Sequence, residues 1–172
     1  MTYEIRAVSE ADWQVLRSVR LQALADAPDA FATTLEEAMA FSDDRWRERA
    51  RGTETSRMFL AFADDRAMGI AGLFDEEDGS AQLISVWVLP DQRGKGIAQA
   101  LTTAVMRFAT AAGMRRMTVW FTDGNTAAKK LYERLGFRAT GRHQPVPSRD
   151  SIEEHEMDAL LVPPPSASQG RV

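Results

Sequence analysis

The sequence predicts a single mixed α/β domain with a central, twisted, mostly antiparallel sheet of about seven strands flanked by about four helices. Strand-like and helix-like segments follow one another in the order β, helices, βββ, α, β, α, ββ. The three consecutive strand-like segments are joined by short turn formers, which is typical of an antiparallel meander. The length of 172 residues, with 44% apolar and 27% charged composition, suits one domain with one sizeable core.

The N-terminal part is expected to contain a strand, a helix and two shorter helical pieces. Residues 3–8 (YEIRAV) alternate like a strand, and residues 9–24 have apolar side chains near helical spacing. Residues 26–41 and 42–50 then resemble two shorter helices. Ser42 separates them, because its hydroxyl can cap the second piece.

Strands and helices alternate in the rest of the chain. Strand patterns cover residues 57–64, 67–76 and 81–89, and the DDR and EDGS connectors suit hairpin turns. An apolar helical stripe starts at Ile97 and ends at Gly113. After it the pattern predicts a strand over residues 114–122, a helix over residues 125–136, and strands over residues 137–143 and 154–162.

Composition excludes several functional classes. A net charge of −4 argues against a nucleic-acid partner, which needs clustered Lys and Arg. The absence of cysteine rules out disulfides, thiolate zinc sites and a cysteine nucleophile, and it suits the cytoplasm. The two histidines, His143 and His155, are too few for a metal site, so we expect no metal.

The hydropathy of the chain and the composition of its C-terminal segment predict how the protein is organised into domains. No apolar segment has the length of a signal peptide or of a membrane-spanning helix, so we expect no membrane partner. Residues 1–162 are expected to form one domain. The Pro- and Ser-rich residues 163–172 are expected to be a disordered tail.

A glycine-rich bend before a long helix is the first stretch that points to function. In LPDQRGKGIAQALTTAVMRFA (residues 89–109), Gly94 and Gly96 precede the apolar helix. Such a bend directs backbone N–H groups and the positive end of the helix dipole at one point, where glycines let a phosphate approach. Arg93 and Lys95 add positive charge, so we expect an anion such as pyrophosphate. An ordinary glycine turn stays open as the alternative.

Two other phosphate motifs do not fit this bend. The dinucleotide fingerprint needs a small third residue where the chain has Gln99, and its βαβ opening should contain no meander. A P-loop needs Ser or Thr after the lysine, but Gly96 follows Lys95.

The stretch TDGNTAAKKLYERLGF (residues 122–137) is the second informative segment. Asn125 is a suitable helix N-cap, and Tyr132 lies seven residues later, which returns it to nearly the same helix face. Both side chains can therefore reach one ligand. The alternatives are a plain cap for Asn125 and a packing role for Tyr132.

These two stretches carry a resemblance to a known superfamily. RGKGIA, from Arg93 to Ala98, together with NTAAKKLYERLGF resembles the GNAT superfamily of acyl-CoA-dependent N-acetyltransferases, and the order of elements is similar over nearly the whole chain. The early segment RLQALADAPDAFATTLEEA and the late segment TGRHQPVPS are similar to a bacterial subgroup that implies no particular substrate. The resemblance implies a GNAT-like fold, acetyl-CoA as the cosubstrate and a possible homodimer.

The resemblance also implies roles for individual residues. Tyr132 would face the thioester sulfur, and Asn125 would contact the pantetheine or the reacting region; these two form the implied catalytic pair. The implied cofactor-binding residues are Val86 and Val88, which would pair with the pantetheine through their backbones, and Arg93, Gly94, Lys95, Gly96, Ala98 and Gln99, which would hold the pyrophosphate.

The amine acceptor would lie between the early helices and the late hairpin, residues 31–50 and 141–155, whose acidic residues could attract a cationic amine. Ordinary solvated charged faces and a surface loop stay open as the alternative. A free amine would attack the acetyl group directly in a ternary complex. Because an alkylamine with a pKa of about 10.4 is mostly protonated at neutral pH, a base is needed. The candidate residues on the acceptor side are Glu36, Glu37, Ser85, Trp87 and Asp123.

The base itself stays open at this point. Members of the superfamily often place a Glu on the fourth strand, where this chain has LISVWV. Three functional classes therefore remain: an N-acetyltransferase acting on a primary amine of a small molecule, a protein acetyltransferase acting on a lysine or an N-terminus, and a non-catalytic acyl-CoA-binding module.

Overall fold

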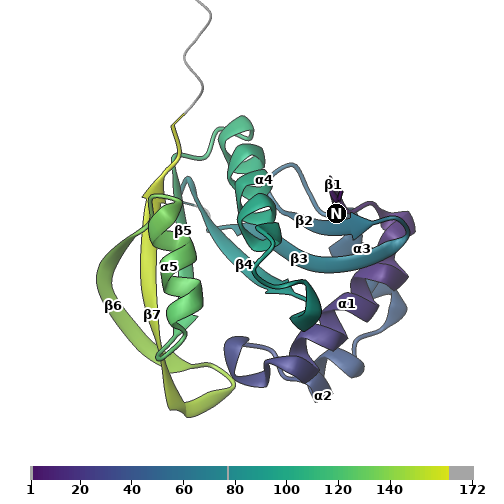
Figure 1. Ribbon diagram of the computed structural model, residues 1–172, viewed down its shortest axis with the longest axis horizontal. Helices are drawn as coiled ribbons and strands as arrows, with labels where there is room; N and C mark the ends of the chain where they lie inside the picture. The colour runs from purple at the N-terminus through teal and green to yellow at the C-terminus, as the bar shows by residue number, and fades with distance from the viewer. Residues whose placement is uncertain (1, 77, 163–172) are drawn as a thin grey trace, which may run out of the picture.

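Seven strands form one mixed sheet in the order β1-β2-β3-β4-β5-β7-β6 (Figure 1). The structure is a computed structural model that describes residues 2–76 and 78–162. All neighbouring strands pair antiparallel except β4 and β5, which are parallel. The strands are β1 (Glu4–Ala7), β2 (Arg57–Ala63), β3 (Arg66–Asp75), β4 (Ser80–Val88), β5 (Arg116–Thr122), β6 (Arg138–Val146) and β7 (Arg149–Leu160).

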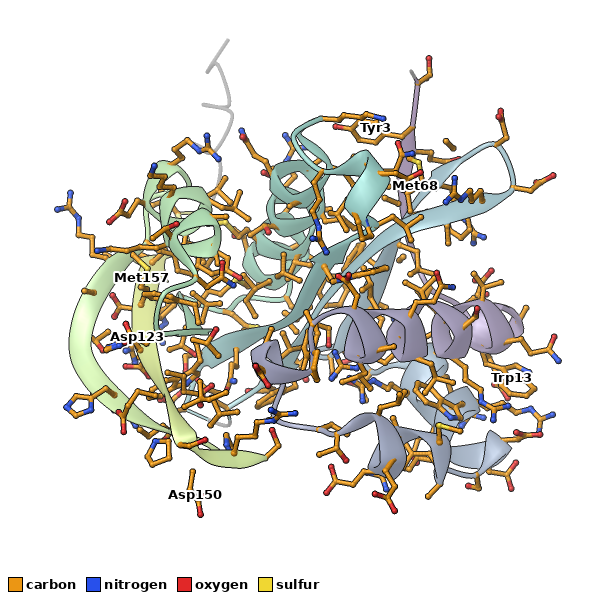
Figure 2. The ribbon with its side chains drawn as sticks, turned by 60° about the horizontal axis from the view of Figure 1, so that its bottom comes forward. Tyr3, Trp13, Met68, Asp123, Asp150 and Met157 are labelled. Atoms are coloured by element: carbon orange, nitrogen blue, oxygen red, sulfur yellow. The ribbon has the colours of Figure 1, made fainter. Side chains whose placement is uncertain are left out.

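Helices cover both faces of this sheet. The α-helices are α1 (Trp13–Asp26), α2 (Leu35–Met39), α3 (Asp43–Arg51), α4 (Ile97–Ala111) and α5 (Thr126–Arg134), and the 3-10 turns are Glu10–Asp12, Pro28–Ala30 and Pro90–Gln92. Figure 1 shows α4 and α5 on one face, over the two halves of the sheet. Figure 2 shows α1 lying across the sheet, with α2 and α3 beside it. The fold therefore has three layers, and the predicted mixed α/β class is confirmed.

Two buried clusters hold the layers together. On the α4 face, Leu101 and Val105 pack in a cluster that includes Met68 of β3. On the opposite face, Leu16 of α1 and Trp46 of α3 belong to a second cluster. Side chains along a strand alternate between faces, so the nearly all-apolar strands β2 and β3 supply both clusters at once.

The prediction of one helix over residues 26–41 is wrong. Pro28 lacks an N–H and disfavours the α conformation of the residue before it, and α1 ends at Asp26. After a 3-10 turn, the chain is extended at Phe31. It re-enters a helix only at α2, where Thr34 and Glu37 form a capping box with N···O distances of 3.2 and 2.8 Å.

Other predicted elements are confirmed with small shifts. Ser42 caps α3 through a hydrogen bond from the N–H of Arg45 (3.3 Å), and α4 ends just before Gly113, whose φ is +83°. The last strand is longer than predicted, since β7 begins at Arg149. The predicted tail, residues 163–172, lies outside the described residues.

The two halves of the sheet separate at the parallel pair. β4 and β5 pair only from Ser80 opposite Arg116 to Leu83 opposite Val119, although both strands continue beyond that point. The pairing of β3 with β4 shifts register in the same region, where Ser85 has a φ of +61°. Such a bulge bends its strand, so β4 diverges from β5 and leaves an opening between them.

Candidate functional site

Two cavities meet where β4 and β5 diverge. The first, which we call the glycine-loop cavity, has a volume of about 650 Å³ and lies between the loop before α4, the end of β4 and α5. The second, which we call the central cavity, has a volume of about 970 Å³ and lies between α1, α3, β4, β5 and the β6–β7 hairpin. Six residues line both cavities: Ala30, Phe31, Val86, Asn125, Ala128 and Tyr132.

The glycine-loop cavity has the features of an anion site. Gly94 and Gly96 have φ values of +78° and +81°, a conformation that favours glycine. A Cβ at Gly94 would have no atom within 4 Å, so the backbone there faces open space. The first backward bond of the helix runs from the N–H of Ala100 to the carbonyl of Gly96 (3.0 Å), which leaves the N–H groups of the first turn available to a ligand.

The lining of this cavity includes most of the residues predicted to bind a cofactor. Val86, Val88, Arg93, Gly94, Gly96, Ala98, Gln99 and Asn125 line it. Lys95 does not, because its ammonium group donates to Gln92 Oε1 (2.9 Å). Most of the predicted residues therefore lie around one cavity, whereas the Lys95 side chain is held by Gln92.

Asp26 fixes the side chains beside the loop. Its carboxylate accepts hydrogen bonds from Trp87 Nε1 (2.8 Å) and from Arg93 Nη2, and Arg93 also donates to the carbonyl of Val88 (3.1 Å). The hydrogen bonds from Trp87 and Arg93 lower the pKa of Asp26 despite an opposing effect of burial. The end of α1 is thus tied to β4 and to the glycine loop, a link that no local sequence pattern indicated.

Asn125 and Tyr132 lie at the junction of the two cavities. Asn125 caps α5 by accepting a hydrogen bond from the N–H of Ala128 (3.1 Å), which leaves its amide N–H groups free of this role. Tyr132 is 5% exposed, and burial raises the pKa of its hydroxyl above the usual range. A neutral phenol at this position can donate a hydrogen bond but releases its proton reluctantly.

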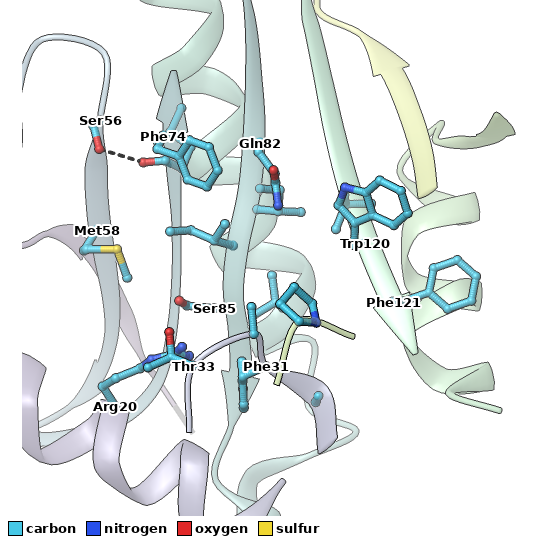
Figure 3. Close-up of a pocket in the computed structure, with 18 of the residues that line it drawn as sticks. Arg20, Phe31, Thr33, Ser56, Met58, Phe74, Gln82, Ser85, Trp120 and Phe121 are labelled. Carbon is cyan, nitrogen blue, oxygen red and sulfur yellow. Dashed lines mark hydrogen bonds between the residues drawn. The ribbon is translucent and has the colours of Figure 1, made fainter. Parts of the chain in front are cut away.

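Charged side chains line the central cavity from two sides. Arg20, Arg45, Arg49 and Arg51 come from α1 and α3, whereas Glu48 and Glu154 are the only acidic residues in the lining among residues 2–76 and 78–162. The expectation of an acidic acceptor side is therefore not met in this lining, because the acidic residues of α2 face elsewhere. Figure 3 shows Arg20, Thr33 and Ser85 close to one another, and Trp120 on the other side of the cavity.

Glu154 is a candidate base that the sequence did not single out. It lies on β7 opposite Thr122, and its Oε1 accepts a hydrogen bond from Gln144 Nε2 (2.8 Å). Burial raises the pKa of Glu154, and the bond from Gln144 only partly opposes this. The sequence around Glu154 alternates like an ordinary hairpin strand, and in such a strand the sequence alone does not distinguish a Glu that lines a cavity from a Glu that is solvated.

The other acceptor-side candidates are distributed unevenly. Ser85 lines the central cavity, and Trp87 lines the glycine-loop cavity. Glu36, Glu37 and Asp123 line neither: Glu37 is used in the capping box of α2, and the side chain of Asp123 is 77% exposed beside His155. A position at the end of a strand, as for Asp123, or in a charged helix turn, as for Glu36 and Glu37, therefore did not predict which side chains line the cavities.

Two further observations concern metals and membranes. Within residues 2–76 and 78–162, no three His, Asp or Glu side chains cluster in a way that could hold a metal ion. Among the described helices, none is long and apolar enough to cross a membrane.

Comparison with known proteins identifies the family to which the chain belongs. Residues 21–137 match the model of the Acetyltransferase (GNAT) family. The chain belongs to the GNAT family. Solved structures agree: a putative acetyltransferase from Salmonella typhimurium, determined with its cofactor acetyl-CoA, has a TM-score of 0.76 at 21% identity, with 94% of this chain and 95% of that chain covered. The seven-stranded sheet and its flanking helices are thus those of a GNAT protein.

Curated GNAT relatives share parts of their sequence with the chain. The human N-acetylaspartate synthetase is 39% identical over 50% of this chain and 29% of its own length. The mycothiol acetyltransferase of Salinispora tropica is 32% identical over 77% and 43%, and the aminoglycoside N(6')-acetyltransferase type 1 of Salmonella typhimurium is 34% identical over 49% and 63%. The chain therefore spans 29% to 63% of the length of these relatives.

Proposed function

We propose that the protein is an N-acetyltransferase that moves the acetyl group of acetyl-CoA directly to a primary amine of a small molecule. The observation that carries the proposal is the junction of the two cavities at Val86, Asn125 and Tyr132. A cosubstrate in one cavity and an acceptor in the other would meet there without a covalent enzyme intermediate. Holding both reactants in this way is itself a large part of catalysis.

The glycine-loop cavity fits the cosubstrate. Its open backbone at Gly94, together with Gly96 and the N-terminus of α4, would receive the pyrophosphate. Beyond Leu83 the end of β4 has no strand partner on its β5 side, so the backbone of Val86 and the N–H of Val88 would be offered to the pantetheine arm, while the carbonyl of Val88 already accepts a hydrogen bond from Arg93. When bound, acetyl-CoA supplies an acetyl group activated as a thioester.

Glu154 would prepare the acceptor amine for attack. An alkylamine with a pKa of about 10.4 is only about one part in a thousand neutral at pH 7.4, which costs about 4 kcal/mol. A carboxylate whose pKa is raised by burial is a better base than an exposed one, and Glu154 stands in the wall of the acceptor cavity. It would take the proton directly or through one water.

Tyr132 would stabilise the departing thiolate. An ordinary phenol, with a pKa of about 10, is a weaker acid than a thiol of pKa about 8.5, so full proton transfer is uphill by roughly 2 kcal/mol. Burial makes the proton of Tyr132 still harder to release. The residue therefore acts mainly as a hydrogen-bond donor to the developing negative charge.

The shape of the acceptor side supports a small molecule. The β6–β7 hairpin is tied to the segment after α1, since Ser148 Oγ donates to the carbonyl of Phe31 (2.9 Å) and Arg149 pairs with Asp29 (2.6 Å). These contacts join the two walls of the central cavity on one side, whereas an extended peptide needs an open groove. The names of the mycothiol and aminoglycoside relatives are in keeping with this substrate class.

The test is thiol release from acetyl-CoA in the presence of single amines: amino acids, polyamines, aminoglycosides and lysine peptides. Acceptor-dependent release, with an acetylated product found by mass spectrometry, is the expected result. Release with lysine peptides alone would indicate a protein acetyltransferase. CoA binding measured by calorimetry, with no release on any amine, would contradict the proposal and favour a binding module.

A further inference from the structure

Arg20 is buried in the wall of the central cavity without a counterion. It lies on α1, is 5% exposed and lines the cavity. Its Nη1 has no hydrogen-bond partner, and no ion pair joins it to any described residue. A buried charge of this kind is costly unless something pairs with it.

The surroundings of Arg20 do not provide that partner. Its guanidinium stacks over the ring of Phe31 at 4.4 Å, which uses its face and leaves its N–H edge. Arg20, Thr33 and Ser85 line the same cavity, and Figure 3 labels all three there. Burial and the like charge of Arg49 lower the pKa of Arg20, so its neighbours add to the positive potential.

The charges of the cavity are also unevenly distributed, since Glu48 of α3 is the one described acidic residue in the lining on the side of the arginines. Arg45 and Arg49 of α3 share the wall with Arg20, and within the described residues neither has an ion pair. Glu154, on β7, lines the opposite part of the cavity, beyond β4 and β5. A ligand with an anionic group at one end and an amine at the other would match both sides.

We propose that Arg20, supported by Arg49, binds an anionic group of the acceptor, a carboxylate or a phosphate, while the amine of the same molecule points to Glu154 and Tyr132. This inference rests on the proposed transferase function and names its substrate class: an amine that also carries an acid group, as an amino acid does. A guanidinium binds both anions through paired hydrogen bonds, so the two sources share one chemistry.

The kinetic test compares acceptors that differ only in the anion. Glycine and alanine are paired with glycinamide and alaninamide, and phosphoethanolamine with ethanolamine, at saturating acetyl-CoA. The wild type is expected to prefer the anionic member of a pair at least tenfold in kcat/KM, and the preferred pair distinguishes carboxylate from phosphate. Arg20→Gln should raise KM for that member by about 10- to 100-fold and leave the neutral member unchanged.

Two variants keep the test interpretable. Arg17→Gln removes an arginine one turn earlier on α1, outside both cavities, and should keep the preference. If Arg20→Gln does not fold, as judged by circular dichroism, Arg49→Gln takes its place with a smaller expected loss. Equal use of anionic and neutral acceptors by the wild type, or a preference that survives both substitutions, would overturn the inference while the transferase function stands.

A binding measurement separates this inference from the proposed function. Succinate and inorganic phosphate are titrated by calorimetry into the protein with CoA bound. Binding of either anion that Arg20→Gln weakens tenfold or more, even without turnover on any amine, supports the anion site and counts only against the transferase. No binding of either anion, together with transfer to neutral amines, counts only against the anion site.

Discussion

Replacement of Tyr132 by Phe removes one hydroxyl at the junction of the two cavities and little else. The ring stays in contact with Phe137, at 5.6 Å between ring centroids, and no described residue is hydrogen-bonded to the hydroxyl. The variant should therefore unfold at nearly the same denaturant concentration as the wild type. A hydrogen bond to a charged group contributes about 1.5 to 3 kcal/mol, so kcat should fall by about 10- to 100-fold.

The assay is initial-rate thiol release at saturating acetyl-CoA and saturating acceptor. Tyr3→Phe is a matched control, because it removes the only other tyrosine hydroxyl of the chain and lies outside both cavities. Wild-type kcat in Tyr132→Phe would refute the assigned role. A loss well above 10³-fold would show instead that Tyr132 transfers its proton, as a general acid does.

The pH dependence gives an independent check on the same role. Because burial raises the pKa of Tyr132, its hydroxyl stays protonated throughout the range in which the enzyme would be assayed. The pH profile of Tyr132→Phe should therefore be lower than that of the wild type but have the same shape. A basic limb below pH ~10 that disappears in the variant would contradict this account.

Three further predictions concern the base, the glycine loop and acid stability. Glu154→Gln should lower kcat by about 10²- to 10⁴-fold and remove the acidic limb of the pH profile of kcat/KM. Glu153→Gln, the control, should keep the wild-type kcat and the acidic limb. An acidic limb that is unchanged in Glu154→Gln would exclude Glu154 as the base. Gly94→Ala should weaken CoA binding in calorimetry by tenfold or more, because a Cβ there would project into the open space beside the loop. Gly113→Ala, at a similar φ but outside the cavity, should cost the same stability, about 1 to 2 kcal/mol, without weakening CoA binding. Burial opposes ionisation of Asp12, but hydrogen bonds outweigh it and hold its pKa at about 2, so its stabilisation is present above pH ~4 and is lost as the pH falls towards 2. Because its partner Arg6 is largely exposed, solvent screens the pair, and Asp12→Asn should cost about 1 kcal/mol at pH 7 and almost nothing near pH 2 in urea titrations.

Local patterns predicted the fold well wherever a residue acts on its own neighbours. The cap at Asn125, the end of α4 at Gly113 and the cap at Ser42 all depend on hydrogen bonds or backbone angles within a few residues. The one clear error, a helix over residues 26–41, also has a local cause, since Pro28 was given too little weight against the helical composition that follows.

The residues of the candidate site also fall into those that local sequence patterns predict and those that depend on tertiary contacts. A glycine bend before a helix and a cap followed by a tyrosine seven residues later are local signals, and the sequence by itself determined that such a bend and such a helix exist. Local sequence patterns did not predict in the same way which residues line the proposed acceptor cavity. Glu36, Glu37 and Asp123 were chosen by their place in the sequence and line neither of the two cavities, whereas Ser85 lines the central cavity.

Only the tertiary structure decided which side chains line the central cavity, where we propose that the acceptor binds. Glu154 on β7 and Arg20 on α1 are far apart in the chain, and they share one cavity because β4 bends away from β5 beyond Leu83. Whether an arginine is solvated or buried without a counterion depends on what packs around it from other elements. That information is carried by contacts between distant segments, so neither the spacing nor the composition around a residue can reveal it.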